Sequence, residues 1–369
     1  RRQAGEQEDA MEGWQKPAIG GEHLGDGSKK GWGEEGVLGV GKHSPDKAWQ
    51  NEEIQHDEET EAMVEFHARN NPHSKAVASD DSCPGGIKFM MYATHHGRDD
   101  RFCRGLESVV RNHIPMHVLG WGLKWHGLSQ KLEGSLEAVR RLPNDCIVVF
   151  TDAYDILYQE GPEAIKDAFL ALNHSIVFSA ECGCWPHVTK PGRICWDKYP
   201  KAPTPYRYLN SGQWAARAAA AAPVLEEALK KTKGNMKIID QEVVADLYME
   251  KSWQYGREKK YDLVLDHYST IFQALHRTDP PDLPYCNPIE AMKMQGQHYY
   301  NTVTKSRPGI FHFNGGGKKV HLSMEEKMWY RKPEHNTNTK IDEVKNTQML
   351  FEKDYRSFNE ICPKHKWAK

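Results

Sequence analysis

The stretch Cys-Ile-Val-Val-Phe-Thr-Asp-Ala-Tyr-Asp, residues 146–155, decides both the fold and the position of the site. Its first five residues form an uninterrupted apolar run, which is typical of a strand covered on both faces. Asp152 comes almost directly after that run, and ligands of open α/β sheets bind at the carboxyl ends of strands. A desolvated carboxylate there needs water, a partner or a cation. Asp155 follows three residues later, so a turn is required to bring the two carboxylates together.

Strands and helices alternate on both sides of this stretch. Apolar runs of strand length occupy residues 87–93, 116–119 and 175–179. Apolar residues at helical spacing lie between them, around 102–110 and 132–142, and a further helix begins at Pro162, in the favoured first position. This order predicts an α/β fold of GT-A-like type, with a mostly parallel, Rossmann-like sheet flanked by helices.

The regular pattern changes after residue 181. A Pro-rich, irregular loop is expected over residues 182–206, followed by helices at 223–232 and 241–250 and a late strand at 263–265. The polar tail carries one expected helix near 340–357. Residues 1–82 have too few aliphatic side chains to offset the entropy of ordering, so we interpret them as a disordered or linker segment. The folded domain is expected at 83–320 and a partly helical extension at 321–369.

Composition excludes some classes of function. The 369 residues carry a formal net charge of −2, and the chain has no long basic stripe, so nucleic-acid binding is not expected. No apolar run approaches the roughly 20 residues that span a bilayer. The sequence begins with Arg1 and Arg2, and we interpret it as a fragment. Membrane association is expected only through an anchor or signal peptide lost upstream.

The cysteines leave two alternatives open. Cys182, Cys184 and Cys195 gather in the 182–206 loop, where a disulfide is geometrically reasonable. The other interpretation is a set of buried, reduced thiols that behave as small hydrophobic groups. The spacing of the eight cysteines gives no pair of CxxC motifs, so a structural zinc site is not expected.

A second motif lies near the end of the folded region. Residues 309–319 place His312 and Asn314 before three glycines, with Lys318 and Lys319 after them. Backbone N–H groups of a Gly-rich loop can hold phosphate oxygens, and the imidazole of His312 is a ligand for a borderline metal such as Mn²⁺. Taken singly, Asp152 and Asp155 are more readily explained as turn and helix caps, and the glycines as an ordinary turn.

Together these motifs resemble the glycosyltransferase domain of the collagen lysyl hydroxylase (procollagen glycosyltransferase) family, a GT-A-type domain that uses UDP-sugars. The resemblance extends with gaps from about residue 87 to residue 319. Its landmarks occur in the same order, at residues 119–125, 150–155, 178–186, 208–212, 240–241, 265–273 and 312–315.

The resemblance implies a set of site residues. The metal, Mn²⁺ or alternatively Mg²⁺, would be held by Asp152, Asp155 and His312. The UDP-sugar would contact six residues, with the ring of Tyr154 on the uracil: Thr94, Lys131, Tyr154, Asn314, Gly315 and Lys318. The catalytic side would consist of Trp125, Asn210 and Asp240. Asp240 would orient the sugar or acceptor, and would act as general base if the reaction inverts, although the resemblance favours retention.

The expected reaction is therefore transfer of a hexose from UDP-glucose or UDP-galactose to a hydroxyl of a protein or glycan, in the lumen of the endoplasmic reticulum or Golgi. Two departures affect the expectation. The acidic run before Gln241 is reduced to Asp240, and the glycine loop reads Phe-Asn-Gly-Gly-Gly at 313–317, where the family has Gly-Asn-Gly-Pro-Thr. Collagen hydroxylation is not expected, since about 50 residues follow Lys319. A catalytically silent UDP-sugar-binding or glycan-binding domain and a metal-dependent phosphohydrolase are the alternatives.

Overall fold

The structure is a computed structural model that describes residues 81–97, 100–252, 261–281 and 283–367. The interpretation of residues 1–82 therefore falls almost wholly outside the described residues. Within the described residues, no helix has the length and apolar character that a membrane span requires.

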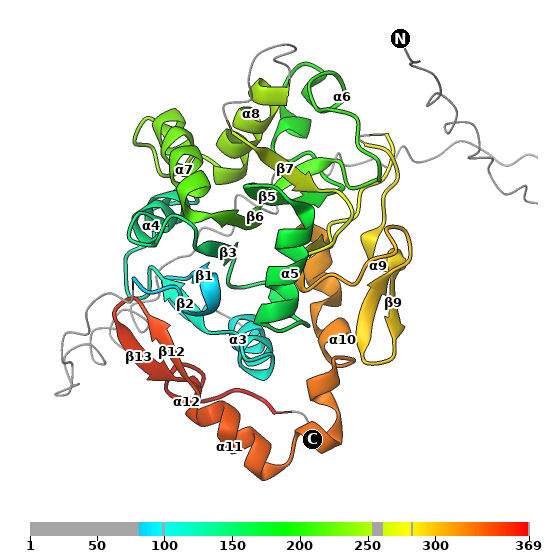
Figure 1. Cartoon of the computed structure of the whole chain (residues 1–369). Coiled ribbons are helices and arrows are strands. Elements are labelled where there is room, and N and C mark those ends of the chain that lie inside the picture. The colour runs from blue at the N-terminus through cyan, green and yellow to red at the C-terminus, as the bar shows by residue number, and fades with distance from the viewer. Residues whose placement is uncertain (1–80, 98–99, 253–260, 282, 368–369) are drawn as a thin grey trace, which may run out of the picture. The chain divides into compact units, whose positions relative to one another are not determined.

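The central sheet has the strand order β13-β12-β2-β1-β3-β6-β5-β7 (Figure 1). Its strands are β1 (Ile87–Tyr92), β2 (Met116–Leu119), β3 (Ile147–Thr151), β5 (Ile176–Glu181), β6 (Tyr208–Arg217), β7 (Leu263–Asp266), β12 (Gln348–Phe351) and β13 (Asp354–Ser357). Strands β12, β2, β1 and β3 run parallel, whereas β6 is antiparallel to both of its neighbours. The sheet is therefore mixed, and the site-bearing strand β3 lies in its middle.

Two smaller sheets complete the strands. One has the order β4-β11-β8, formed by β4 (Ile156–Tyr158), β11 (Ile310–His312) and β8 (Phe272–Ala274). The other pairs β9 (Met292–Gln295) with β10 (His298–Asn301). The first of these carries the ends of the two sequence motifs, because β4 begins directly after Asp155 and β11 ends at His312.

Helices cover both faces of the central sheet. The α-helices of the described residues are α3 (Arg101–Arg111), α4 (Gln130–Val139), α5 (Pro162–Leu172), α6 (Ile194–Asp197), α7 (Ala218–Thr232), α8 (Asp240–Ser252), α9 (Pro288–Ala291), α10 (His321–Glu325), α11 (Asn338–Asn346) and α12 (Phe358–Ile361). The alternation along β1 shows the two faces. Met90 and Tyr92 pack with α4, α7 and α8, while Phe89 and Met91 pack with α3, α5 and α12. Both faces are buried, as the apolar runs of the strands predict.

Most expected elements are present at or near their expected positions, including the helix that begins at Pro162. Helix α7 begins five residues before the expected Pro223, because five alanines of high helix propensity precede that proline. Strand β6 is not expected from its sequence, since its second half is rich in alanine. The expected helix near 340–357 is correct only for α11, and it is wrong for residues 348–357, which form the β12–β13 hairpin.

The hairpin also bears on the expected domain limits. Strand β12 pairs with β2, so part of the segment 321–369 belongs to the same sheet as strands from 83–320. The boundary between 320 and 321 remains a prediction.

Candidate metal and nucleotide site

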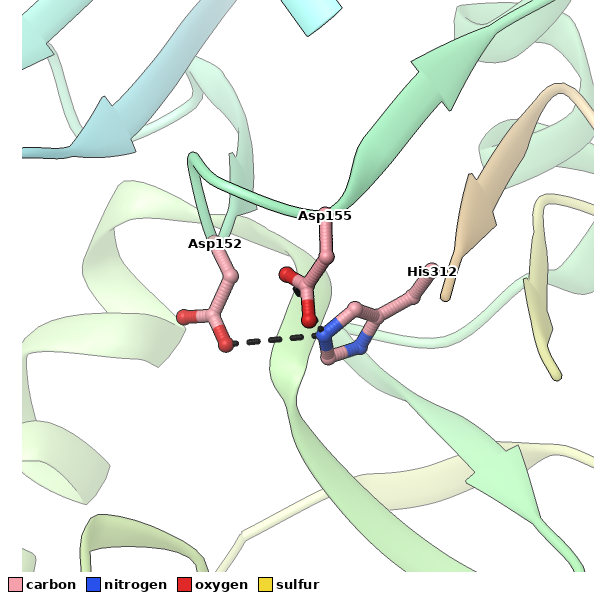
Figure 2. A group of neighbouring side chains, drawn as sticks. All are labelled: Asp152, Asp155 and His312. Atoms are coloured by element: carbon pink, nitrogen blue, oxygen red, sulfur yellow. Dashed lines mark ion pairs between the residues drawn. The ribbon is translucent and has the colours of Figure 1, made fainter. Parts of the chain in front are cut away.

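The turn between β3 and β4 brings Asp152 and Asp155 to one side, as Figure 2 shows. The Asp152 N–H donates to the carbonyl of Gly212 at 2.7 Å, and the Asp155 carbonyl accepts from the Phe313 N–H at 2.7 Å. Each aspartate is thus fixed through its backbone to a different neighbouring segment. The turn that the sequence requires is present, and both carboxylates point toward His312.

His312 ends β11, which pairs with β4 so that His312 lies opposite Ile156. Its Nε2 is 3.6 Å from an Asp152 oxygen and 3.3 Å from an Asp155 oxygen. Its Nδ1 is 3.0 Å from the side-chain oxygen of Asn210, which can only accept a hydrogen bond. Nδ1 therefore carries the proton, and Nε2 is the nitrogen that faces the carboxylates, as in many metal sites.

The three side chains form one candidate metal group. One ligand atom from each of Asp152, Asp155 and His312 lies within 4.8 Å of the others. Burial would lower the pKa of His312, but the neighbouring carboxylates of Asp155 and Asp152 raise it. Burial would raise the pKa of Asp155, but His312 and Lys318 hold it well below its usual range. Two carboxylates and one imidazole are a ligand set that suits Mn²⁺, and carboxylates alone suit Mg²⁺.

Gly212 explains how these groups fit against the sheet. A Cβ at this position would lie 2.4 Å from the His312 ring and 2.7 Å from an Asp152 oxygen. No larger residue fits without displacing one of them. The requirement comes from contacts between distant segments, so periodicity could not reveal it.

Lys131, expected to contact the UDP-sugar, lies between two carboxylates. Its Nζ is 2.7 Å from Asp152 and 3.1 Å from Asp240, and all three groups are buried or half-buried. Burial would lower the pKa of Lys131, but these two carboxylates raise it. Asp240, the first residue of α8, also accepts a hydrogen bond from the Ser211 hydroxyl at 3.0 Å. Lys131 therefore joins Asp152 to Asp240.

Glu181 joins the other polar residues of the site. One of its oxygens accepts hydrogen bonds from Asn210 at 3.0 Å and from Gln241 at 2.9 Å. The other accepts from Asn314 at 2.7 Å. The sequence gives Gln241 no predicted role, and the only signal that could have found it is its position directly after Asp240.

The glycine loop forms the 3-10 helix η3 (Gly315–Val320). Asn314 fixes its start, because its side-chain oxygen accepts from the N–H groups of Leu275 and His276 at 3.1 Å each. Lys318 then lies with its Nζ 3.9 Å from Asp155. Gly315 has φ +50, and a Cβ there would lie 2.5 Å from the His276 ring, so glycine is required on both counts.

Tyr154 belongs to the same turn, between the two aspartates in the chain. Its hydroxyl donates to the His95 carbonyl at 2.8 Å, and its ring lies 5.7 Å from that of Phe102. Burial raises the pKa of Tyr154, and a hydrogen bond with the Thr94 side chain opposes the rise. The structure thus groups Thr94 with Tyr154. Trp125 packs beside Tyr92, with ring centroids 6.4 Å apart.

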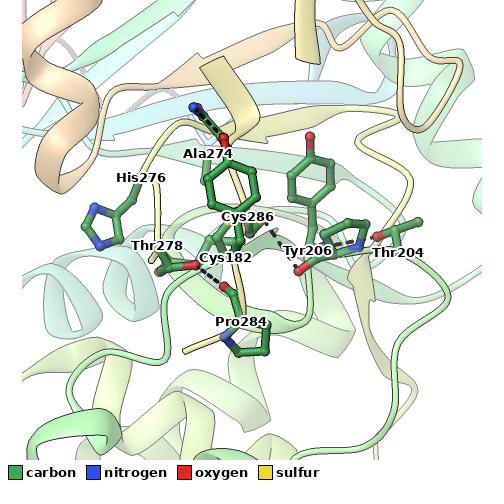
Figure 3. Close-up of a disulfide and its surroundings, with 12 residues drawn as sticks. Cys182, Thr204, Tyr206, Ala274, His276, Thr278, Pro284 and Cys286 are labelled. Atoms are coloured by element: carbon green, nitrogen blue, oxygen red, sulfur yellow. Dashed lines mark hydrogen bonds between the residues drawn. A yellow bond between two sulfur atoms is a disulfide. The ribbon is translucent and has the colours of Figure 1, made fainter. Parts of the chain in front are cut away.

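Disulfides fix the chain segment that follows Glu181. All eight cysteines lie among the described residues, and all are paired. Of the two alternatives for the 182–206 loop, the structure has the disulfide, as Cys184–Cys195. Cys182 pairs instead with Cys286, next to the segment that carries His276 and Thr278 (Figure 3). The other two pairs are Cys83–Cys146 and Cys103–Cys362.

This geometry agrees with the comparisons. Residues 87–335 match the family described as the PLOD GT domain, a glycosyltransferase domain. The chain belongs to this family. Its fold, a large mixed sheet flanked by helices with the aspartate turn at a strand end, resembles that of GT-A glycosyltransferases.

Similar proteins include both uncharacterised and named ones. The chain is 27% identical to uncharacterised protein R699 of Acanthamoeba polyphaga mimivirus, over 62% of this chain and 45% of that protein. It is 27% identical to procollagen-lysine,2-oxoglutarate 5-dioxygenase 2 of Mus musculus, over 64% of this chain and 32% of that protein. It is also 27% identical to the multifunctional procollagen lysine hydroxylase and glycosyltransferase LH3 of Rattus norvegicus, over 51% of this chain and 25% of that protein. The chain thus spans a quarter to less than half of these relatives.

Solved structures give weaker matches. The apo structure of the bifunctional glycosyltransferase WbbM has a TM-score of 0.37 at 11% identity, covering 74% of this chain and 52% of that one. A glycosyltransferase involved in glycosylation of the major capsid of PBCV-1 has a TM-score of 0.36 at 12% identity, covering 66% of this chain and 99% of that one.

Proposed function

We propose that this chain is a Mn²⁺-dependent hexosyltransferase that uses UDP-glucose or UDP-galactose. The observation that carries the proposal is the convergence of Asp152, Asp155 and His312 beside Tyr154 and Lys318, in a chain of the glycosyltransferase family. A phosphohydrolase needs the carboxylates but has no use for an aromatic ring that would stack on a base.

The three ligand residues would hold the metal. His312 fits this role because Asn210 fixes its Nδ1–H and leaves Nε2 toward the carboxylates. Gly212 leaves room for two of the ligands, because a side chain at this position would displace Asp152 and His312. When bound, the metal would neutralise negative charge on the diphosphate leaving group.

Lys318 would add positive charge on the same side, where the N–H groups of the glycine loop can hold phosphate oxygens. Thr94 and Tyr154 would bind the uridine, with the Tyr154 ring against the uracil. Asn314 and Gly315 would keep the loop in place, because both are fixed against the segment of Leu275 and His276.

Asp240 would orient the donor sugar or the acceptor hydroxyl. Its carboxylate lies beside Lys131 and Ser211, which hold it in a buried position. Lys131 would keep Asp152 and Asp240 at a fixed separation, and would thus act on both donor and acceptor. Asn210 would support His312, and Trp125 would offer an apolar face to a sugar ring.

The acceptor would be a hydroxyl of a protein or glycan, and the compartment the lumen of the endoplasmic reticulum or Golgi. Pairing of all eight cysteines supports an oxidising compartment, because disulfides persist there and are rare in the cytosol. Because the names of the relatives include procollagen, procollagen-like peptides are one class of acceptor to screen.

The test is release of UDP from a panel of UDP-sugars, with and without Mn²⁺ and after chelation with EDTA. We expect UDP release from UDP-glucose or UDP-galactose that requires Mn²⁺ and rises when an acceptor is added. Tight UDP binding without release would favour a silent binding domain. Phosphate release from simple esters without preference for uridine would favour a phosphohydrolase.

A further inference from the structure

The β12–β13 hairpin lies outside the residues that match the family, yet its β12 end reaches the edge of the sheet that carries the proposed nucleotide site. Strand β12 runs parallel to β2, with Leu350 opposite His117 and Phe351 opposite Val118. Strands β2, β1 and β3 are also parallel. The carboxyl end of β12 therefore lies at the same edge as Thr94 and Asp152.

Glu352, the residue after β12, is fixed to the end of β2 by three hydrogen bonds. Its N–H donates to the Val118 carbonyl at 2.9 Å, and its carbonyl is 2.9 Å from His117 Nε2. Its side-chain carboxylate accepts from the backbone N–H of Gly120. Glu352 therefore holds the loop of residues 120–122, which we name the β2 loop.

The β2 loop has little freedom to move away from Glu352. Gly120 has φ +80, and a Cβ there would lie 2.4 Å from the Tyr92 ring. Gly122 donates its N–H to the Thr94 carbonyl at 2.9 Å. One end of the loop thus contacts Glu352, and the other end contacts a residue proposed to bind the nucleotide.

A row of aromatic rings makes a second connection. Phe351 meets Trp121 edge-on at 4.9 Å, and Trp121 stacks on Phe102 at 5.6 Å. Phe102 in turn lies 5.7 Å from Tyr154. Aromatic pairs at such distances are mutually stabilising. The disulfide Cys103–Cys362 joins the residue after Phe102 to the segment that follows the hairpin.

We propose that Glu352 and Phe351 are positioning residues for the uridine pocket, acting through the β2 loop on Thr94 and through Trp121 and Phe102 on Tyr154. The inference rests on the proposed use of a UDP-sugar. It assigns a role in donor binding to a hairpin that lies beyond the family match at residues 87–335.

The experiment measures UDP affinity in Mn²⁺ by calorimetry, donor KM and kcat, and the melting temperature of the full chain. Glu352→Ala should weaken UDP binding and raise donor KM about 5- to 10-fold, since one charge-assisted hydrogen bond is lost. The value of kcat should stay within about 2-fold. Glu352→Gln keeps an oxygen that can accept from the Gly120 N–H, so its affinity for UDP should be close to that of wild type. Both variants remove the negative charge, so a difference between them would show that the hydrogen bond, and not the charge, is what matters.

Phe351→Leu gives a second variant that keeps the site apolar, and it should raise the Kd for UDP about 3-fold. Tyr355→Ala is the matched control, because Tyr355 lies on the same hairpin and its side chain is exposed. Hydrogen exchange at Gly120 and Gly122 tests the connection without any ligand. These amides should exchange faster in Glu352→Ala than in Tyr355→Ala.

Wild-type protein that binds UDP while Glu352→Ala binds it equally well would overturn this inference and leave the proposed function intact. A lower melting temperature with unchanged Kd and KM would also overturn the inference, since the role of Glu352 would then be purely structural. Wild-type protein that binds no UDP in Mn²⁺ would overturn the proposed function first and this inference with it.

Discussion

The two sides of the candidate site are built in different ways. The metal side consists of Asp155 and His312, next to or at the ends of the paired strands β4 and β11, and of Lys318 in the 3-10 helix η3. The Asp240 side consists of Asp240, Lys131 and Ser211, from helices α8 and α4 and from strand β6. Asp152 belongs to both, because one of its oxygens faces His312 and the other faces Lys131.

This difference indicates how each side would respond to change. Asp155 and His312 are fixed by backbone hydrogen bonds of the paired strands, so their positions should depend little on distant side chains. The Asp240 side depends on how two helices pack on the sheet, and it is also where the acidic run of the family has become Ile238-Ile239-Asp240. We therefore expect the metal side to govern donor binding and the Asp240 side to govern turnover.

The largest expected effect is that of Asp155→Asn. This change removes a charged ligand that is buried beside His312, so Mn²⁺-dependent binding of UDP should weaken at least about 100-fold in calorimetry. Asp167→Asn, at an exposed carboxylate on α5, is the control and should bind UDP normally. Unchanged affinity in Asp155→Asn would remove Asp155 from the metal site.

A change on the Asp240 side should give the opposite pattern. Asp240→Asn should lower kcat about 100-fold, the size typical of a lost acid–base or orienting group, while the Kd for UDP changes less than about 3-fold. Steady-state kinetics with saturating donor and acceptor would measure this. If the affinity of Asp240→Asn for UDP fell as far as that of Asp155→Asn, donor binding and turnover would not be divided between the two sides.

His312→Ala should have a smaller effect on the metal side, because two carboxylates remain. The Mn²⁺ concentration for half-maximal activity should rise about 10-fold, with a smaller change in kcat at saturating Mn²⁺. Asn210→Ala should act in the same direction more weakly, since it removes the hydrogen bond that orients the imidazole. A metal titration identical to wild type would count against His312 as a ligand.

The same comparison explains what can be predicted from sequence. Asp152, Asp155 and His312 each stand at or near the end of an apolar strand, and the rule for strand ends makes those positions candidates for a site. Lys131 and Gln241 follow no such rule. The structure places Lys131 between two carboxylates, because α4 packs against the same face of the sheet as α8.

The C-terminal segment is the part that the sequence predicts least well. Strands β12 and β13 carry Gln348, Asp354 and Arg356, so they lack a clear apolar alternation, and the pattern favours a helix instead. They form strands because β2 offers an open edge for pairing, which is information from tertiary structure. The disulfide between Cys103 and Cys362 spans 259 residues and cannot be found from spacing either.

The smallest expected effect is on the pH dependence of folding stability, through the buried residue His321. His321 is buried against Phe313, with ring centroids 4.5 Å apart, and burial lowers its pKa to about 4. Below pH 6.5 the unfolded chain takes up a proton that the folded chain does not, so His321 costs stability as the pH falls from 6.5 toward 4. The cost at pH 5 is at most about 2 kcal/mol.

His321→Phe should therefore lose less stability between about pH 7.5 and pH 5 than wild type does, measured as the shift in urea midpoint between the two pH values. Using the difference between two pH values cancels any change in packing that is the same at both. His113→Asn replaces an exposed histidine and should show the wild-type difference. If His321→Phe lost as much stability on acidification as wild type, burial would not lower the pKa of His321 and its imidazole would take up the proton in the folded chain as readily as in the unfolded one.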